Sequence, residues 1–288
     1  MMRRVILCMV AIAICFAAGA QVVPFVTIQP SAERLAGGGA HVATPDNLPI
    51  TANVFEIGVG KTLWQTKAID YNLTNIDARV QITPALTAGL AVTSNSMDEM
   101  TLYGENGQGL GTSQPTELCA GIVLAYNPAG NLFVNVAGKY IRSALTDNDD
   151  ATCFAADLGA IWRFAQSISA GIKVENIGGT IDYGYGAYPL PTTFKGGAYG
   201  IFGGKHAVEL AADFGVMPSY DTFLTCASAG YVFDKMIAVR VGAHISTNGD
   251  IMPTYASVGA AFTSDIFDIS AAYLTAANTY SISIRLKL

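Results

Sequence analysis

The residue types that catalyse reactions or bind metals are few in this chain and lie far apart in its sequence. The three histidines, His41, His206 and His244, are not within metal-ligand spacing of one another. The stretch Gly60–Thr62 reads like the end of a phosphate-binding loop, but the first glycine of that motif would fall at Phe55. No Gly-x-Ser-x-Gly motif is present. The sequence therefore predicts a protein that is not an enzyme and that holds no metal and no cofactor.

Nine ionisable residues fall on one face of strands that a period-two alternation predicts. Over residues 236–246, Arg240 and His244 alternate with the apolar Val239 and Val241. The charged face is otherwise built of glycine and alanine, which suits a narrow lumen. We expect these side chains to face the lumen of a barrel: Lys139, Asp157, Arg163, Lys173, Glu175, Glu209, Asp213, Arg240 and His244. Opposite charges that pair across the lumen would hold the barrel closed, whereas unpaired ones would form a site, and both interpretations stay open.

One long connection, Ile177–Pro191, has a composition typical of recognition loops. It places Tyr183, Tyr185 and Tyr188 among glycines and prolines. Tyrosine supplies a large contact area at a low cost in conformational entropy, and glycine lets a loop adapt to a partner. We therefore predict that this loop binds a protein partner. The alternative is a loop that folds inward and plugs the pore.

The connections that position these residues alternate between long and short. Long polar ones, such as Ser143–Asp150 and Ser246–Met252, are separated by tight turns such as Asn127–Gly130 and Asp234–Lys235. Outer-membrane β-barrels alternate in this way because short turns face the periplasm and longer loops face outward. Eleven strands are predicted from Glu117 onward, and the upstream segments near 54–60, 66–74, 76–83, 85–94 and 97–104 supply the rest. Because single-chain bacterial barrels have even strand numbers, fourteen is the best total, with twelve or sixteen as alternatives.

The composition favours the same fold. The chain is 51% hydrophobic and only 13% charged, against about 25% charged residues in soluble domains. After the first twenty residues, no apolar run approaches the roughly 18–20 residues of a membrane helix. A closed barrel is the other structure that satisfies every backbone group in lipid. The predicted fold is therefore all-β, a transmembrane antiparallel β-barrel of about fourteen strands. A net charge of −6 argues against nucleic acid as a partner.

The N-terminus predicts export across the inner membrane. Arg3 and Arg4 precede an apolar run, and the small residues Ala18–Ala20 suit a cleavage site. We expect a signal peptide over residues 1–20. An N-terminal segment at or in the lumen and the first strand are expected over 21–50, and the barrel over 51–288. Localisation in the bacterial outer membrane and contact with its lipid follow from this division.

Both ends of the chain resemble a known family. The start has Pro24-Phe25, Ile28-Gln29-Pro30, Glu33-Arg34, Gly37–Gly39 and His41–Thr44, and the end has the segments AVRVGA, SVGAAF, FDISAAYL and NTYSISIRL. These motifs resemble PorV/PorQ-type outer-membrane proteins of the type IX secretion system, which are similar to FadL-like barrels of fourteen strands. None of the motifs is catalytic.

The resemblance implies a role in type IX protein secretion and surface attachment. Its partners would be secretion-system proteins and the C-terminal domains of cargo proteins. Two alternatives remain: a FadL-like channel for small hydrophobic compounds, and a structural outer-membrane protein without a ligand.

Overall fold

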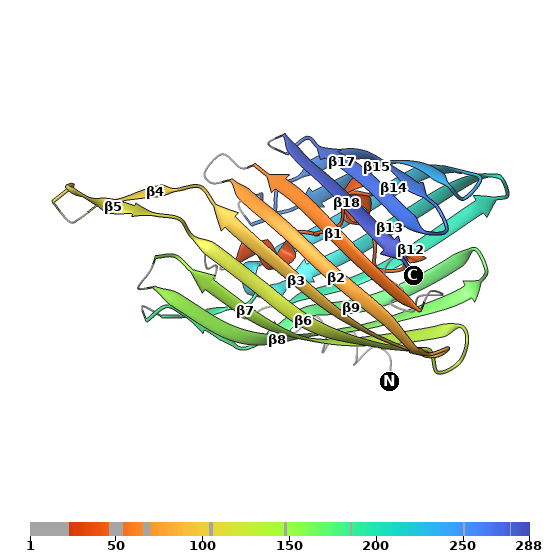
Figure 1. The fold of residues 1–288 in the computed structure, drawn as a ribbon, viewed down its shortest axis with the longest axis horizontal. Helices are drawn as coiled ribbons and strands as arrows, with labels where there is room; N and C mark the ends of the chain where they lie inside the picture. Colours follow the sequence, from red (N-terminus) through yellow and green to blue (C-terminus); the bar gives the residue numbers. More distant parts are fainter. Residues whose placement is uncertain are drawn as a thin grey trace.

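The chain forms a closed barrel of antiparallel strands (Figure 1). The computed structural model describes residues 23–45, 54–65, 70–103, 106–146, 149–184, 186–249, 251–276 and 278–288. The prediction of a fourteen-stranded antiparallel barrel is confirmed, and β18 closes it by pairing with β1. In barrel order the strands are β1 (Phe55–Trp64), β2 (Tyr71–Thr83), β3 (Leu86–Met97), β6 (Thr116–Tyr126), β7 (Leu132–Ala144), β8 (Asp150–Ala165), β9 (Ile168–Gly178), β12 (Thr193–Gly203), β13 (His206–Met217), β14 (Thr222–Phe233), β15 (Ile237–Ser246), β16 (Tyr255–Thr263), β17 (Phe267–Leu274) and β18 (Thr279–Lys287).

Alternation of residue type along each strand produces the two faces of the wall. On β15, Val239 and Val241 are about half exposed on the outside, whereas the side chain of Arg240 is largely covered inside. Ile172 on β9 is 68% exposed in the same outer belt. An apolar outer face and a polar, small-residue inner face are what lipid on one side and a filled lumen on the other require.

The two ends of the barrel differ in the length of their connections. We call the end with tight turns, such as the one between β14 and β15, the short-turn end, and the opposite end the long-loop end. Two small hairpins lie at the long-loop end: β4 (Met100–Tyr103) with β5 (Gly109–Ser113), and β10 (Thr180–Asp182) with β11 (Ala187–Pro189). The first of them projects well beyond the barrel wall (Figure 1).

The upstream strands differ in detail from their predicted positions. Within the described residues the first strand is β1, which lies beyond the 21–50 range expected to hold it. Within the described residues, the two strands predicted near 66–74 and 76–83 form the single strand β2, because Asn75 and its neighbours continue the ladder without a turn. Of the segment predicted near 97–104, Met97 ends the wall strand β3, and residues 100–103 form β4 outside the wall, so the segment adds no strand to the fourteen.

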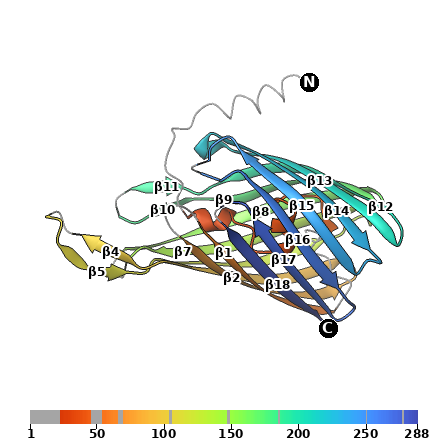
Figure 2. The ribbon, with the colours of Figure 1, turned by 90° about the horizontal axis from the view of Figure 1, so that it is seen from above.

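Residues 23–45, the N-terminal segment, thread the lumen inside the ring of strands (Figure 2). The segment contains the 3₁₀ turn η1 (Pro24–Thr27) and the short helix α2 (Ala32–Ala36). Another 3₁₀ turn, η3 (Pro218–Tyr220), connects β13 with β14. Within the described part of the chain, no helix is long and apolar enough to cross a membrane.

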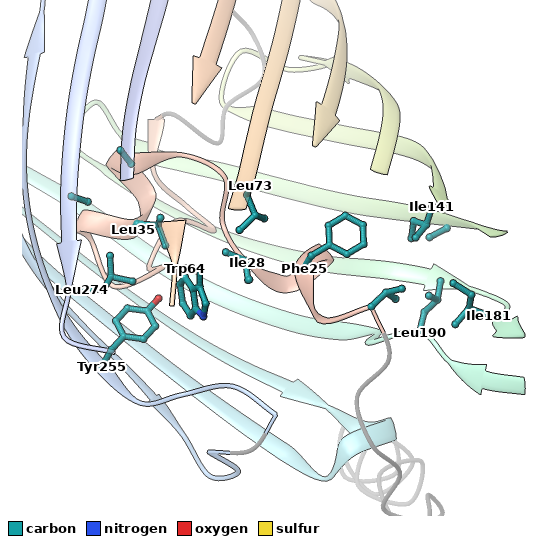
Figure 3. Close-up of a cluster of buried hydrophobic side chains, with 14 of the residues drawn as sticks. Phe25, Ile28, Leu35, Trp64, Leu73, Ile141, Ile181, Leu190, Tyr255 and Leu274 are labelled. Carbon is teal, nitrogen blue, oxygen red and sulfur yellow. The ribbon is translucent and has the colours of Figure 1, made fainter. Parts of the chain in front are cut away.

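The main buried cluster joins the N-terminal segment to the long-loop ends of the strands (Figure 3). Phe25 and Leu35 contribute from the segment, and Trp64, Leu73 and Ile141 from the wall. All five side chains are at most 3% exposed. Burying such side chains stabilises the docked segment by about 1.5–3 kcal/mol each. The core of this barrel is therefore built around its own N-terminal segment.

Candidate binding site in the barrel lumen

Hydrogen bonds from inward-facing serines fix the N-terminal segment along its length. The hydroxyl of Ser283 on β18 accepts from the Ala32 amide at 3.0 Å, and Ser257 on β16 donates to the Ala36 carbonyl at 2.8 Å. Further along, Ser169 on β9 donates to the Ala43 carbonyl at 2.7 Å. Because Ser169 lies beside the short turn before β9, the segment runs from the long-loop end to near the short-turn end.

Asp213 on β13 is one of the predicted lumen residues, and it holds this segment directly. One of its carboxylate oxygens accepts from the amides of His41 and Val42 at 2.7 and 2.9 Å. The His41 ring is fully buried, and burial, followed by Arg34 and the nearby lysines, lowers its pKa to about 3. The ring is therefore neutral, with Nδ1 placed to donate to the Gly39 carbonyl at 2.6 Å.

Arg240 on β15 forms a triad with Glu209, which is also a predicted lumen residue, and with Glu33 of the N-terminal segment. Its guanidinium contacts Glu33 at 2.9 Å and also pairs with Glu209 on β13. The intervening strand β14 carries Gly230 at this level, and a Cβ there would lie 2.5 Å from a Glu209 carboxylate oxygen. Glycine at 230 therefore allows Arg240 to reach over β14.

A β-bulge in β9 gathers a second group of predicted lumen residues. Lys139 on β7 pairs with Asp157 on β8 at 2.7 Å and donates to the side-chain oxygen of Asn176 at 2.9 Å. Asp157 in turn accepts from the Asn176 amide at 2.8 Å. Asn176 has φ 57°, and the β8–β9 register breaks beside it. A bulge re-aims side chains locally, and here the re-aimed amide completes the Lys139–Asp157 pair.

Glu175, one residue before the bulge, sits between two lysines. It contacts Lys173 at 2.8 Å and Lys195 on β12 at 2.7 Å. The two lysines are a direct cross-strand pair, so their mutual repulsion is offset by the shared carboxylate. The ion pairs predicted to cross the lumen thus run along the wall instead, within β9, between neighbouring strands or, for Arg240 with Glu209, over one intervening strand. Contacts of Arg240 and Asp213 reach the N-terminal segment instead.

The remaining two predicted residues are placed differently. His244 on β15 is buried, with Nδ1 3.2 Å from the Cys226 sulfur and its ring stacked on Tyr255 at 4.9 Å. Arg163 lies toward the short-turn end of β8, with its guanidinium over the Phe133 ring at 5.1 Å. Among the described residues Arg163 makes no ion pair. No group of three metal-ligating side chains is found in the described part of the chain.

Between the N-terminal segment and one half of the wall lies a cavity of about 250 Å³. Its wall comes from β2, β3, β6 and β7, where Ala91, Gly121 and Ala137 leave room, and its other side comes from Phe25 and Ile28. Two of the ion pairs just described also line the cavity: Lys139 with Asp157, and Lys173 with Glu175. The cavity is mostly apolar with a few convergent polar groups, which is the usual character of a small-molecule site.

Sequence reasoning missed several lumen residues that surround the cavity. Lys195 follows the same alternation as Thr193 and Gly197, so parity within β12 could have found it. Asp77 and Arg79 were missed because β2 was divided into two segments, to which no common parity was applied. Both face the lumen, and Asp77 pairs with Arg285 on β18 at 3.2 Å.

The tyrosine loop folds inward at its two ends. Ile181 and Leu190 are almost fully buried in the main cluster, beside Ile141 (Figure 3). Tyr183 packs against the same cluster, and burial raises the pKa of its hydroxyl. Tyr188 is 38% exposed on β11, and Tyr185 lies outside the described residues. The β10–β11 hairpin therefore covers part of the long-loop end of the lumen.

Comparisons with known proteins support the fold. No family model and no curated protein matches the chain. Among solved structures, it is similar to the toluene transporter TbuX of Ralstonia pickettii, with a TM-score of 0.64 and 12% identity over 90% of this chain and 98% of that one. It is also similar to the CymD monoaromatic hydrocarbon channel, with a TM-score of 0.65 and 13% identity over 90% of this chain and 97% of that one. A FadL homologue of Pseudomonas aeruginosa covers 94% of this chain and matches over its whole length, with a TM-score of 0.60 and 10% identity.

These likenesses show an outer-membrane barrel fold of the kind found in FadL-type proteins. Because the sequences are only 10–13% identical, these similarities show a shared fold and do not show a shared function.

Proposed function

We propose that this chain is an outer-membrane channel for a small, largely apolar compound, which passes through the lumen beside the N-terminal segment. The observation that carries the proposal is the cavity of about 250 Å³ between that segment and the β2–β7 wall. A purely structural protein would have no need of this space, which the small residues Ala91, Gly121 and Ala137 leave open. The solved structures of similar fold include proteins described as a toluene transporter and a monoaromatic hydrocarbon channel, which supports the proposal.

Uptake of radiolabelled toluene by cells that display the protein in their outer membrane tests this function. Expression should raise the initial uptake rate several-fold over cells without the protein. Ala91→Phe and Ala137→Phe should each return the rate close to background, because both side chains line the cavity.

Ala229→Phe provides the matched control. Ala229 is an alanine on the lipid-facing side of β14, where a phenyl ring meets membrane instead of lumen. Uptake by this variant should equal that of the wild type. Equal uptake with and without the protein, or full uptake by both cavity variants, would reject the channel function.

A second candidate function, type IX protein secretion, is favoured by the PorV-like motifs at both ends of the chain and by the projecting β4–β5 hairpin (Figure 1). In this role the long-loop end would receive the C-terminal domain of a cargo protein. The partner-binding residues would include the exposed Tyr188 and, as further proposals, Tyr183 and Tyr185.

Binding of a purified cargo C-terminal domain to the detergent-solubilised chain tests the secretion role. Replacing Tyr188 by serine should weaken that binding, while shortening the β4–β5 hairpin should abolish it. Absence of binding by the intact chain would remove this candidate and leave the channel proposal untouched.

A further inference from the structure

The cavity is closed toward the long-loop end by a layer of buried side chains. Going from the cavity to that end, the next inward residues on β2, β3, β6 and β7 are Leu73, Asn95, Glu117 and Ile141. All four side chains are at most 4% exposed. A solute therefore reaches the cavity from this end only when something that covers the layer moves away.

The β10–β11 hairpin supplies much of this cover. Ile181 on β10 and Leu190 just after β11 are 0% and 2% exposed, and they pack in the main cluster beside Ile141 (Figure 3). Tyr183 packs against the same cluster, and its hydroxyl lies against Ser143. The other hairpin at this end, β4–β5, projects away from the barrel (Figure 1). Folding inward is thus a property of the β10–β11 hairpin and not of long connections in general.

The base of the hairpin is fixed to the wall and lies next to a hinge. The Asn176 side chain donates to the Pro191 carbonyl at 3.3 Å, and the Thr192 hydroxyl donates to the Asn176 carbonyl at 2.8 Å. Gly178 ends β9 and Gly179 follows it, where a Cβ would meet nothing within 4 Å. Hinges are commonly a few residues at the ends of elements that absorb a change in φ and ψ, and glycine does so most freely. The hairpin can therefore rotate about its base.

Above the base, a tyrosine from another connection holds the hairpin down. The Tyr220 hydroxyl, in the η3 turn between β13 and β14, donates to the Pro189 carbonyl of β11 at 2.7 Å. The Tyr220 ring packs with Met217 and Leu224 in a second buried cluster, which fixes the position of the hydroxyl. One hydrogen bond of this kind is much easier to break than the ladder of a wall strand.

The layer under the hairpin contains polar groups that water would stabilise. The Glu117 carboxyl is buried and accepts from the Asn95 amide at 2.9 Å. The other side-chain atom of that amide, Asn95 Oδ1, has no hydrogen-bond partner among the described residues. A buried polar atom without a partner costs free energy, and water that enters on opening would remove this cost. The closed state is therefore opposed by the layer that it covers.

Resting on the proposed channel function, we propose that the β10–β11 hairpin is a lid over the outer entrance of the cavity. The lid rotates about Gly178 and Gly179, breaks the bond from Tyr220 to Pro189 and lifts its apolar side chains out of the main cluster. A solute from the long-loop end enters only while the lid is open, so the frequency of opening sets the rate of entry.

Two native cysteines report on the lid without any engineered thiol. Cys153 on β8 is 7% exposed and belongs to the same cluster as Ile181, whereas Cys226 on β14 is 6% exposed and lies beside His244. The purified full chain is treated with a hydrophilic maleimide, and the modification rate of each cysteine is measured by mass spectrometry of its peptide. In the wild type, Cys153 should react at least tenfold more slowly than the same thiol in the unfolded chain, because it reacts only after local opening.

Two substitutions should open the lid by different routes. Tyr220→Phe removes the hydroxyl that holds Pro189 and keeps the ring, and it should accelerate modification of Cys153 about threefold. Leu190→Ala removes packing from the lid itself and should accelerate this modification at least tenfold. Cys226 should react at the wild-type rate in both variants. Toluene uptake by cells that display Tyr220→Phe should rise in proportion to the modification rate of Cys153.

Matched variants separate movement of the lid from loosening of the whole barrel. Tyr273→Phe removes a hydroxyl that donates to Asn278 at the same end of the barrel. Leu274→Ala removes a leucine from the main cluster, far from Leu190 (Figure 3). Both variants should modify Cys153 within twofold of the wild-type rate. Faster migration of unboiled than boiled protein in detergent gels should show that every variant is a closed barrel.

The lid would be overturned by wild-type modification rates of Cys153 in both Tyr220→Phe and Leu190→Ala, or by equal acceleration of Cys153 and Cys226. Unchanged toluene uptake by Tyr220→Phe, with accelerated modification of Cys153, would overturn the lid as the entrance. In these cases uptake by the wild type would still support the channel function. Accelerated modification of Cys153 without any toluene uptake by the wild type would overturn the channel function and leave the lid as a closure of the long-loop end.

Discussion

The two halves of the lumen are lined by similarly small side chains, yet one half is packed and the other is hollow. Against β15–β18, α2 packs on the wall, and the two glycines after it lie so close that a Cβ on Gly242 would be 2.3 Å from the Gly38 nitrogen. Against β2–β7, Ala91 and Ala137 face the cavity of about 250 Å³.

The comparison shows that small inward residues do not determine by themselves whether a lumen is filled. In the packed half, Ser257 and Ser283 supply hydrogen bonds that the backbone of the segment needs, so close approach is favourable. In the hollow half, Arg79 and Lys139 supply charge and Phe25 supplies an apolar surface. One half therefore binds a peptide backbone, and the other is free to bind a solute.

Gly242→Ala should have the largest effect on this contrast. The added methyl would overlap backbone atoms of Gly37 and Gly38. Neither residue can move away without breaking the hydrogen bonds that their amides donate to the Glu33 and Leu35 carbonyls of α2. Overpacking of this kind costs about 1–3 kcal/mol or more. We expect the segment to leave its place, with amide hydrogen exchange over residues 32–45 accelerated by at least tenfold.

Gly138→Ala is the control for that experiment. Nothing lies within 4 Å of a Cβ at Gly138, which faces outward on β7. Exchange of the segment should match the wild type in this variant. If Gly242→Ala behaved in the same way, the packed half would be looser than its geometry indicates.

Asp213→Ala should have the next largest effect. It removes the acceptor for the His41 and Val42 amides and leaves both donors buried. A hydrogen bond to a charged group contributes about 1.5–3 kcal/mol. Exchange should accelerate near residues 41–43 and less around α2, whose serine bonds remain.

Asn135→Ala removes a polar side chain from the hollow half and should leave segment exchange unchanged. An equal response to Asp213→Ala and Asn135→Ala would mean that the two halves hold the segment equally.

The fold was predictable from the sequence to a large extent, and the reasons are local. From Glu117 onward, strict alternation and short turns such as Asp234–Lys235 determine both the strands and their register. Prediction was weaker before Glu117, because β2 runs through Asn75 and Asp77, which resemble turn residues. The β4–β5 hairpin continues the direction of neighbouring strands without joining the wall, and no pattern of residues marks that difference.

The site was less predictable, because its geometry depends on contacts between distant segments. Parity placed residues such as Asp213 and Arg240 on the inner face, but it could not show that both hold the N-terminal segment. The bulge at Asn176 depends on the Asp157 carboxylate of the neighbouring strand. The hollow beside Arg79 arises from what the segment leaves unfilled, which no single strand encodes.

A change of pH should release the segment gradually, and a fall of a single pH unit should have a smaller effect than Asp213→Ala. Burial holds the pKa of His41 near 3 in the docked segment, whereas in a released segment it would return to about 6.5. Below pH 6.5 the released form binds a proton that the docked form does not, so docking weakens as pH falls toward 3. The loss is about 1.4 kcal/mol per pH unit in that window. Hydrogen exchange of the Val42 and Ala43 amides, corrected for intrinsic rates, should reveal it between pH 6.5 and 4.5.

His41→Gln separates this titration from that of the lumen carboxylates. The docked imidazole has no hydrogen-bond partner at Nε2 among the described residues, so a proton there would be buried without an acceptor, and that penalty belongs to His41 alone. Glutamine does not titrate, so exchange at residues 42 and 43 in this variant should be independent of pH over the same window. A pH dependence equal to that of the wild type would place the titrating group elsewhere, with Asp213 next to be tested because it binds the same two amides.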